Sequence, residues 1–187
     1  MNLPNKLTIL RIALIPVFMA LLMIDGIPHN YFWAMLVFVI ASITDALDGN
    51  IARKQGLVTD FGKLMDPLAD KMLVTSAVVL FLYLGLANPI AVLIILARDM
   101  LVNSMRLIAA SKGVVLAAGF FGKLKTASQM TGIITVMVLK EAAYIGIPFV
   151  SDYADLISLV IMWIISALTL ASGIDYVVKY RKYISTK

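Results

Sequence analysis

The sequence predicts an all-α integral membrane protein, with six transmembrane helices forming a single bundle over residues 1–187. Two observations support this prediction. Hydrophobic residues make up 61% of the chain and charged residues only 14%, with a mean hydropathy of +0.96, whereas soluble domains average about 45–50% apolar and about 25% charged residues. The apolar residues also form continuous runs of helical length, without the alternation that is typical of a β-barrel.

Each predicted helix is an apolar run near the ~20 residues that a helix needs to cross a bilayer. The first run has no small-residue cleavage site after it, so we interpret it as a retained helix and not as a removed signal peptide. Residues typical of turns separate the runs, such as Asp25-Gly26-Ile27-Pro28 after the first and Asn88-Pro89 before the fourth. The predicted spans are 7–24, 31–53, 67–86, 89–111, 122–143 and 154–179.

The distribution of basic residues predicts the orientation in the membrane. The net charge is +5, and the lysines and arginines cluster at both termini and beside the second and fourth breaks. By the positive-inside rule, both termini and the break between the second and third spans lie in the cytoplasm. Because the charges are dispersed among apolar spans, a membrane surface is a better partner for them than nucleic acid. The chain has no cysteine, which excludes disulfides and thiolate chemistry.

Four aspartates beside the second break are the strongest functional signal. They occur in Asp45-x-x-Asp48-Gly49-x-x-Ala52-Arg53 and Gly62-x-x-x-Asp66-x-x-x-Asp70. The i, i+3 and i, i+4 spacings place each pair on one face of a helix, with Pro67 suited to the first turn of the third span. Any one aspartate taken alone would be a helix cap or a solvated residue. Four at a membrane boundary are costly without cations, so together they predict a site for hard divalent ions.

Small and basic residues adjoin these acids. Gly49 and Ala52 leave room either for a neighbouring helix or, beside a metal site, for a flat nucleotide. Arg53 is suited to bind a phosphate. Gly62 is expected at the turn from loop to helix, close to the ligand.

Four further cations predict an anion site. Arg98 and Arg106 lie inside the fourth span, where arginines are expensive and normally face the bundle interior. Lys123 and Lys125 lie at the cytoplasmic start of the fifth span. If these cations converge on the aspartates, they would bind a phosphomonoester. Two alternatives remain open: an ion pair of Arg98 with Asp99, and simple anchoring of the lysines at the membrane surface.

The titratable residues of the chain limit which side chain can act as the general base. The only histidine, His29, falls in a predicted external loop. With no cysteine and no histidine on the cytoplasmic side, the base must be a carboxylate, and Asp70 is the candidate.

The motif from Asp45 to Asp70 resembles the signature of the CDP-alcohol phosphotransferase family, with every fixed position present. The segments Pro4–Arg11 and Gly122–Thr126, the latter followed by Gln129-Met130, are similar to a bacterial subgroup of that family. The resemblance implies a homodimeric six-helix bundle in the bacterial plasma membrane, with its active site facing the cytoplasm. It also implies transfer of a phosphatidyl group from CDP-diacylglycerol to glycerol 3-phosphate, which gives phosphatidylglycerophosphate and CMP. Serine or inositol phosphate as the acceptor, and more remotely cation transport, are the alternatives.

The resemblance also implies residue roles. Two Mg²⁺ or Mn²⁺ ions would be held by Asp45, Asp48, Asp66 and Asp70, and Asp70 would also accept the proton of the attacking hydroxyl. The residues expected to bind CDP-diacylglycerol are Asn5, Thr8, Gly49, Ala52, Arg53 and Gly62. Those expected to bind the acceptor phosphate are Arg11, Arg98, Arg106, Lys123 and Lys125.

Overall fold

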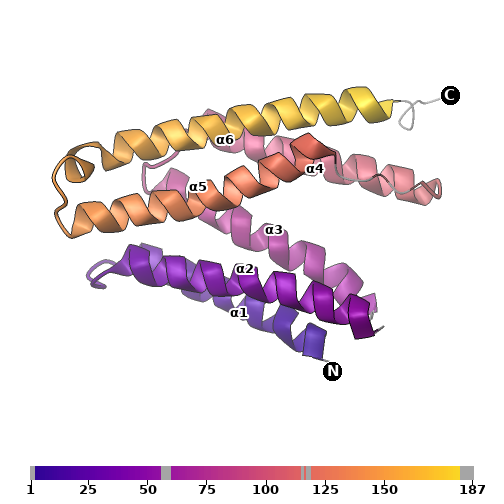
Figure 1. Cartoon of the computed structure of the whole chain (residues 1–187), viewed down its shortest axis with the longest axis horizontal. Coiled ribbons are helices and arrows are strands. Elements are labelled where there is room, and N and C mark those ends of the chain that lie inside the picture. Colours follow the sequence, from indigo (N-terminus) through magenta and orange to yellow (C-terminus); the bar gives the residue numbers. More distant parts are fainter. Residues whose placement is uncertain (1–2, 56–59, 115, 117–118, 182–187) are drawn as a thin grey trace. The chain divides into compact units, whose positions relative to one another are not determined.

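The computed structural model describes residues 3–55, 60–114, 116 and 119–181, with side chains for all of these except 3–4, 46–55, 60–61, 63–64 and 66–67. The described chain is all helical, with six helices, as predicted (Figure 1). Their bounds are α1 Leu3–Met23, α2 Asn30–Gln55, α3 Asp60–Tyr83, α4 Pro89–Ser111, α5 Phe120–Tyr144 and α6 Val150–Tyr180.

Local sequence explains where the helices end. Asn88 caps α4: its side chain accepts a hydrogen bond from the backbone N–H of Ile90 at 2.9 Å, and Pro89 occupies the first turn. After α4 the chain turns at Gly113, whose φ of 73° is accessible to glycine at little cost. The predicted breaks at Gly26 and Gly146 also fall between helices.

The start of α3 differs from the prediction. This helix begins at Asp60, seven residues before the predicted start at residue 67. Pro67 is therefore not in the first turn, whereas Gly62 is the third residue of the helix and lies in that turn. The prediction used hydropathy, which detects only the apolar part of a helix. The polar stretch Asp60-Phe61-Gly62-Lys63 therefore gave no signal, although it is helical.

The chain divides into two compact units, residues 1–80 with 137–154 and residues 81–136 with 155–187. In the first unit α1 packs along α2 (Figure 1). Phe18 of α1 and Phe38 of α2 are both fully buried, with ring centroids 5.7 Å apart. Ala34 and Ala41 lie one turn on either side of Phe38 and are also fully buried, which lets the two helices approach closely.

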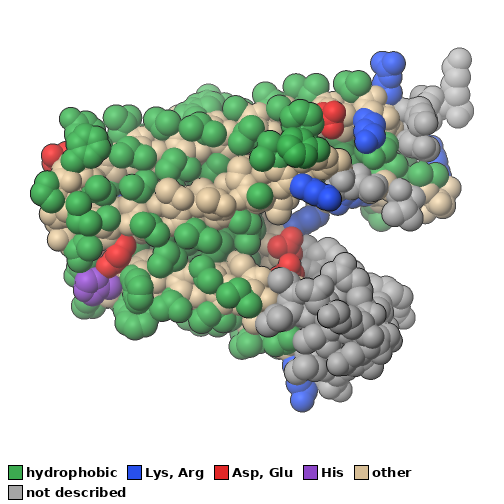
Figure 2. Space-filling view, viewed as in Figure 1, with side chains coloured by type: hydrophobic (Ala, Val, Ile, Leu, Met, Phe, Trp, Pro, Cys, Tyr) green, Lys and Arg blue, Asp and Glu red, His purple; other side chains and the backbone are tan. Residues whose placement is uncertain are grey.

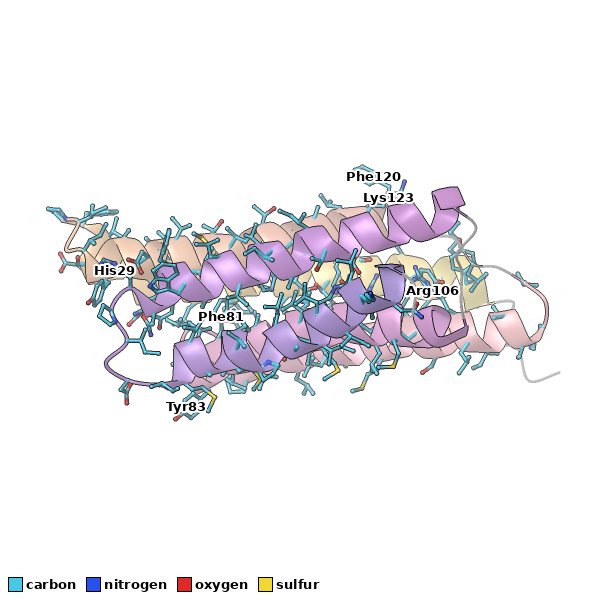
Figure 3. The ribbon with its side chains drawn as sticks, turned by 90° about the horizontal axis from the view of Figure 1, so that it is seen from below. His29, Phe81, Tyr83, Arg106, Phe120 and Lys123 are labelled. Carbon is cyan, nitrogen blue, oxygen red and sulfur yellow. The ribbon has the colours of Figure 1, made fainter. Side chains whose placement is uncertain are left out.

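The loop before α2 is attached to the end of α5 within the first unit. Glu141 accepts hydrogen bonds from the backbone N–H of Phe32, at 3.2 Å, and pairs with Nδ1 of His29 (labelled in Figure 3). The carboxylate thus satisfies an otherwise unpaired donor in the first turn of α2. His29 has a structural partner here, in line with its predicted place in a loop between the first two helices.

In the second unit, α4, the first part of α5 and most of α6 pack together. Tyr176 of α6 is buried against Val102 and Met105 of α4. Gly132 of α5 meets α6 so closely that an added Cβ would lie 2.3 Å from Cδ1 of Ile165. A larger residue there would have to displace the end of the Ile165 side chain.

This contact gives a test of the packing. Gly132→Ala is expected to lower the free energy of unfolding by about 1–3 kcal/mol, as overpacking does in a dense core. Ile165→Val removes the clashing Cδ1 atom, so the double variant is expected to recover most of the loss. Thermal unfolding in detergent measures both. Equal stability of wild type and Gly132→Ala would contradict the described packing.

Helix α6 buries several polar groups and exposes apolar ones. Four of its serine and threonine side chains are buried, namely Ser158, Ser166, Thr169 and Ser172. On the same helix large apolar side chains are exposed, among them Leu156, Trp163, Ile164, Leu170 and Val178. Figure 2 shows hydrophobic side chains over much of the visible surface. Extended exposed apolar surface is typical of a protein that meets a membrane.

Among the described residues, two helices are long and apolar enough to cross a membrane, Asn5–Met23 and Val150–Tyr180. A shorter apolar stretch, Asn30–Asp45, lies in α2. Crossing of the membrane by all six helices stays a prediction.

Candidate active site

The N-terminal half of α1 presents polar side chains on its buried face. Asn5, Thr8 and Arg11 follow one another at intervals of three residues and are at most 8% exposed. Ile15, Phe18 and Leu22 continue the buried face in apolar form. Polar residues on a packed helix face need partners, so this end of α1 is built around a polar site.

Arg11 and Asp45 form an ion pair between α1 and α2. Nη1 of Arg11 lies 2.8 Å from Oδ1 of Asp45, and Nε donates to the carbonyl oxygen of Ala41 at 3.3 Å. The arginine side chain is fully buried and the aspartate side chain is 41% exposed. One of the four predicted metal ligands is thus oriented by a buried cation that reaches it from another helix.

The other predicted ligands are described in part. Asp70 is exposed on α3, next to buried Ala69. Asp48 of α2 and Asp66 of α3 lie outside the described side chains, as do Gly49, Ala52 and Arg53. Among the side chains that are described, no group of three or more metal-binding residues occurs. The convergence of the four aspartates therefore stays a prediction.

The chemistry of the predicted donors fits hard divalent ions. The described carboxylates, Asp45 and Asp70, reach solvent, so a cation could contact them. A set made only of carboxylate oxygens suits Mg²⁺ or Mn²⁺ and not softer metals.

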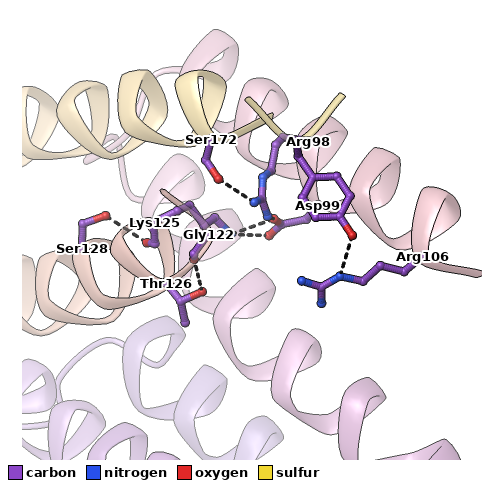
Figure 4. Close-up of polar contacts among 9 residues, drawn as sticks. Arg98, Asp99, Arg106, Gly122, Lys125, Thr126, Ser128 and Ser172 are labelled. Atoms are coloured by element: carbon purple, nitrogen blue, oxygen red, sulfur yellow. Dashed lines mark hydrogen bonds and ion pairs between the residues drawn. The ribbon is translucent and has the colours of Figure 1, made fainter. Parts of the chain in front are cut away.

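A second polar cluster lies in the second unit (Figure 4). Nζ of Lys125, from α5, lies 2.7 Å from both carboxylate oxygens of Asp99, from α4. Nη1 of Arg98 lies 3.0 Å from Oδ1 of the same aspartate, and Nη2 donates to the hydroxyl of Ser172 on α6 at 2.7 Å. Two cations share one carboxylate, so these three side chains together keep a charge of +1.

The ion pair of Arg98 with Asp99, which the sequence left open as an alternative, is present, and Asp99 binds Lys125 as well. Lys125 is 5% exposed, so it is held inside the unit and is not an anchor at the surface. Burying a cation that deeply is costly without a partner. Asp99 supplies that partner.

Arg106 and Lys123 are placed differently. Nε of Arg106 donates to the hydroxyl of Tyr176 at 3.2 Å, and its guanidinium carbon lies 5.6 Å from the centre of that ring. The arginine is otherwise exposed, as is Lys123, which projects from the first turns of α5 (Figure 3). The four predicted cations therefore comprise buried Lys125 and partly buried Arg98, both on Asp99, and two exposed ones.

Three residues at this cluster were not predicted as site residues: Ser172, Gly173 and Tyr176 of α6. Their signal in the sequence is weak, because single small or aromatic residues are common in apolar helices. A periodic series of hydroxyls on an otherwise apolar helix, from Ser158 to Ser172, was the available indication that this face of α6 is polar.

Comparison with known proteins assigns the family. Residues 1–172 match the family model of CDP-alcohol phosphatidyltransferase. The chain belongs to this family. The match covers all the predicted site residues, from Asn5 to Lys125.

Individual relatives are similar along nearly their whole length. The chain is 38% identical to a Bacillus subtilis protein, over 94% of this chain and 93% of that protein. It is 40% identical to a Rickettsia bellii protein, over 97% of each. Both are named CDP-diacylglycerol–glycerol-3-phosphate 3-phosphatidyltransferase. A Mycobacterium tuberculosis relative, 35% identical over 95% of this chain and 81% of that protein, is named probable phosphatidylglycerophosphate synthase.

Proposed function

We propose that this protein transfers the phosphatidyl group of CDP-diacylglycerol to glycerol 3-phosphate, giving phosphatidylglycerophosphate and CMP. The observation that carries the proposal is the similarity over nearly the whole chain to relatives named for this reaction. The described structure is consistent with it: a carboxylate-bearing polar region lies in one unit, and a cationic cluster suited to a phosphomonoester lies in the other.

In the proposed mechanism Asp45, Asp48, Asp66 and Asp70 hold divalent ions. When bound, such ions neutralise charge on the diphosphate and on the departing CMP. Arg11 keeps the carboxylate of Asp45 in place. Asn5, Thr8, Gly49, Ala52, Arg53 and Gly62 would border the CDP group.

The chemical step is a single in-line displacement. Asp70 accepts the proton of the 1-hydroxyl of glycerol 3-phosphate. The resulting oxygen forms a bond to the β-phosphorus of CDP-diacylglycerol, while the bond from that phosphorus to the bridging oxygen breaks. The electron pair of the broken bond leaves with CMP. The β-phosphorus keeps its diacylglycerol group and is now esterified to glycerol 3-phosphate.

The cationic cluster would bind the phosphate of the acceptor. Arg106 and Lys123 are exposed and suited to contact it directly, whereas Arg98 and Lys125 support it from inside. Arg11 was predicted at this phosphate as well, but its guanidinium is buried and bonded to Asp45. We therefore assign Arg11 to the carboxylate side of the site.

We further propose that the protein is a homodimer in the bacterial plasma membrane, with six spans, cytoplasmic termini and an active site facing the cytoplasm. The apolar exposed surface, the two long apolar helices and the bacterial relatives support the membrane location. The acyl chains of the substrate would then stay among membrane lipids while the polar groups react.

The test is an assay with purified protein, CDP-diacylglycerol in mixed micelles and labelled glycerol 3-phosphate. Release of CMP in equal amount to labelled lipid would support the proposal. Serine and inositol phosphate serve as alternative acceptors. Faster CMP release with either of them would assign a different acceptor, and no release with any acceptor would refute the transferase activity.

Metal removal gives a separate prediction. Chelation with EDTA is expected to reduce CMP release below detection, because four uncompensated carboxylates would repel the diphosphate. Excess Mg²⁺ or Mn²⁺ should restore it, whereas Na⁺ at matched ionic strength should not. Full activity in EDTA would contradict the predicted role of the aspartates.

A further inference from the structure

In the second unit, three residues of α6 lie against the two arginines of α4. They are Ser172, Gly173 and Tyr176. Ser172 and Tyr176 are four residues apart and share one helix face, and their hydroxyls bond Arg98 and Arg106 respectively. Both hydroxyl-bearing side chains are at most 4% exposed.

Gly173 allows Arg98 to lie close to α6. A Cβ added at this position would lie 2.9 Å from Cγ of Arg98. That atom belongs to the stem of the arginine and not to its flexible end, so the whole side chain would have to shift. The residue type at position 173 therefore sets where the Arg98 guanidinium lies.

Tyr176 orients Arg106 in a way that leaves its binding groups available. The tyrosine ring is buried against Val102 and Met105, so its hydroxyl is held in a defined place. Only Nε of Arg106 is bonded to it, at 3.2 Å. The two terminal nitrogens form the fork that binds a phosphate in bidentate fashion, and the exposed position of Arg106 allows an anion to reach them.

We propose that Tyr176 is a positioning residue that holds Arg106 for the phosphate of the acceptor and so favours a phosphorylated acceptor, and that Ser172 and Gly173 position Arg98, which supports this site from inside through its pair with Asp99. This inference rests on the proposed function for the identity of that acceptor. It assigns no direct contact of the three residues with the reacting atoms.

The main test is Tyr176→Phe, which keeps the packed ring and removes the hydroxyl. We expect the KM for glycerol 3-phosphate to rise about tenfold, as loss of a hydrogen bond to a charged group implies. The kcat, the KM for CDP-diacylglycerol and the unfolding temperature should stay near wild type. Tyr153→Phe, at an exposed position of the same helix, is the matched control and should change none of these values.

A double-variant cycle separates positioning from a general structural role. In an Arg106→Ala background, Tyr176→Phe should raise the KM for glycerol 3-phosphate less than twofold, because the arginine through which it acts is gone. Gly173→Ala is a second variant and should raise the same KM by displacing Arg98. Equal effects of Tyr176→Phe in both backgrounds, or no effect in wild type, would overturn the proposal.

A binding readout distinguishes this inference from the proposed function. Inorganic phosphate, compared with NaCl at matched ionic strength, should raise the unfolding temperature of wild type, and Tyr176→Phe should need about tenfold more phosphate for the same shift. If wild type shows this dependence but uses no glycerol 3-phosphate, only the proposed acceptor is wrong. If wild type is active and phosphate acts equally on both proteins, the positioning role is wrong.

Discussion

Asp70→Asn is expected to lower the kcat for CMP release by about 10²–10⁴-fold, the range that a positioned general base contributes. Asparagine has nearly the same shape but cannot accept the proton of the attacking hydroxyl, and it is a poorer ligand for a hard cation. Asp70 is exposed on α3, so the substitution should leave the fold intact. CMP release at saturating substrates, together with the unfolding temperature, measures both effects.

Asp25→Asn is the matched control, because Asp25 is also exposed but lies between α1 and α2. It should retain wild-type kcat. Activity of Asp70→Asn within a few-fold of wild type would exclude Asp70 as the base. A further aspartate of the predicted set would then have to accept the proton.

The second large effect concerns Arg11 and Asp45, and it is expected in stability as well as in activity. Asp45→Asn removes the carboxylate that lies 2.8 Å from Nη1 of the fully buried Arg11 side chain. Removing one partner of a buried ion pair costs about 3–5 kcal/mol. The aspartate side chain is 41% exposed, so solvent screening reduces the expected loss to about 1–3 kcal/mol.

The reverse substitution should be milder. Arg11→Met fills a similar volume without charge and leaves Asp45 at a position that water reaches. The double variant Arg11→Met/Asp45→Asn should recover most of the lost stability, because an apolar replacement of a buried pair is often neutral. It should not recover activity, since a predicted metal ligand is gone.

Thermal unfolding in detergent with EDTA tests this pair without any contribution from bound metal. The expected order of stability places Asp45→Asn lowest. If Arg11→Met is instead the less stable single variant, the ion pair does not stabilise the packing of α1 on α2 as described.

The helices were predictable because their signals are local. The runs of apolar residues and the turn residues between them placed six helices, and Asn88-Pro89 gave the start of α4 at the correct residue. The start of α3 was missed by seven residues, because a helix that leaves an apolar environment loses its hydropathy signal while keeping its backbone hydrogen bonds.

The sequence predicted which residues belong to the candidate site. It did not predict which of them contact one another. Four aspartates and a set of cations stand out in an apolar chain because charge is expensive there. A pair between Arg98 and Asp99, which are neighbours in the chain, was one of the alternatives that the sequence left open. Nothing local indicated that Lys125 would join them, since 26 residues separate it from Asp99.

The sequence by itself thus determined the all-helical fold, the likeness to a family and the carboxylate motif, since each is written in residues that lie close together along one or two helices. Only the tertiary structure decided which charges meet: Arg11 with Asp45, Lys125 with Asp99, and Arg106 with Tyr176. The physical reason is that a partner 26 to 70 residues away is chosen by how whole helices pack. That packing depends on small residues such as Gly173, whose importance shows only when the facing helix is in place.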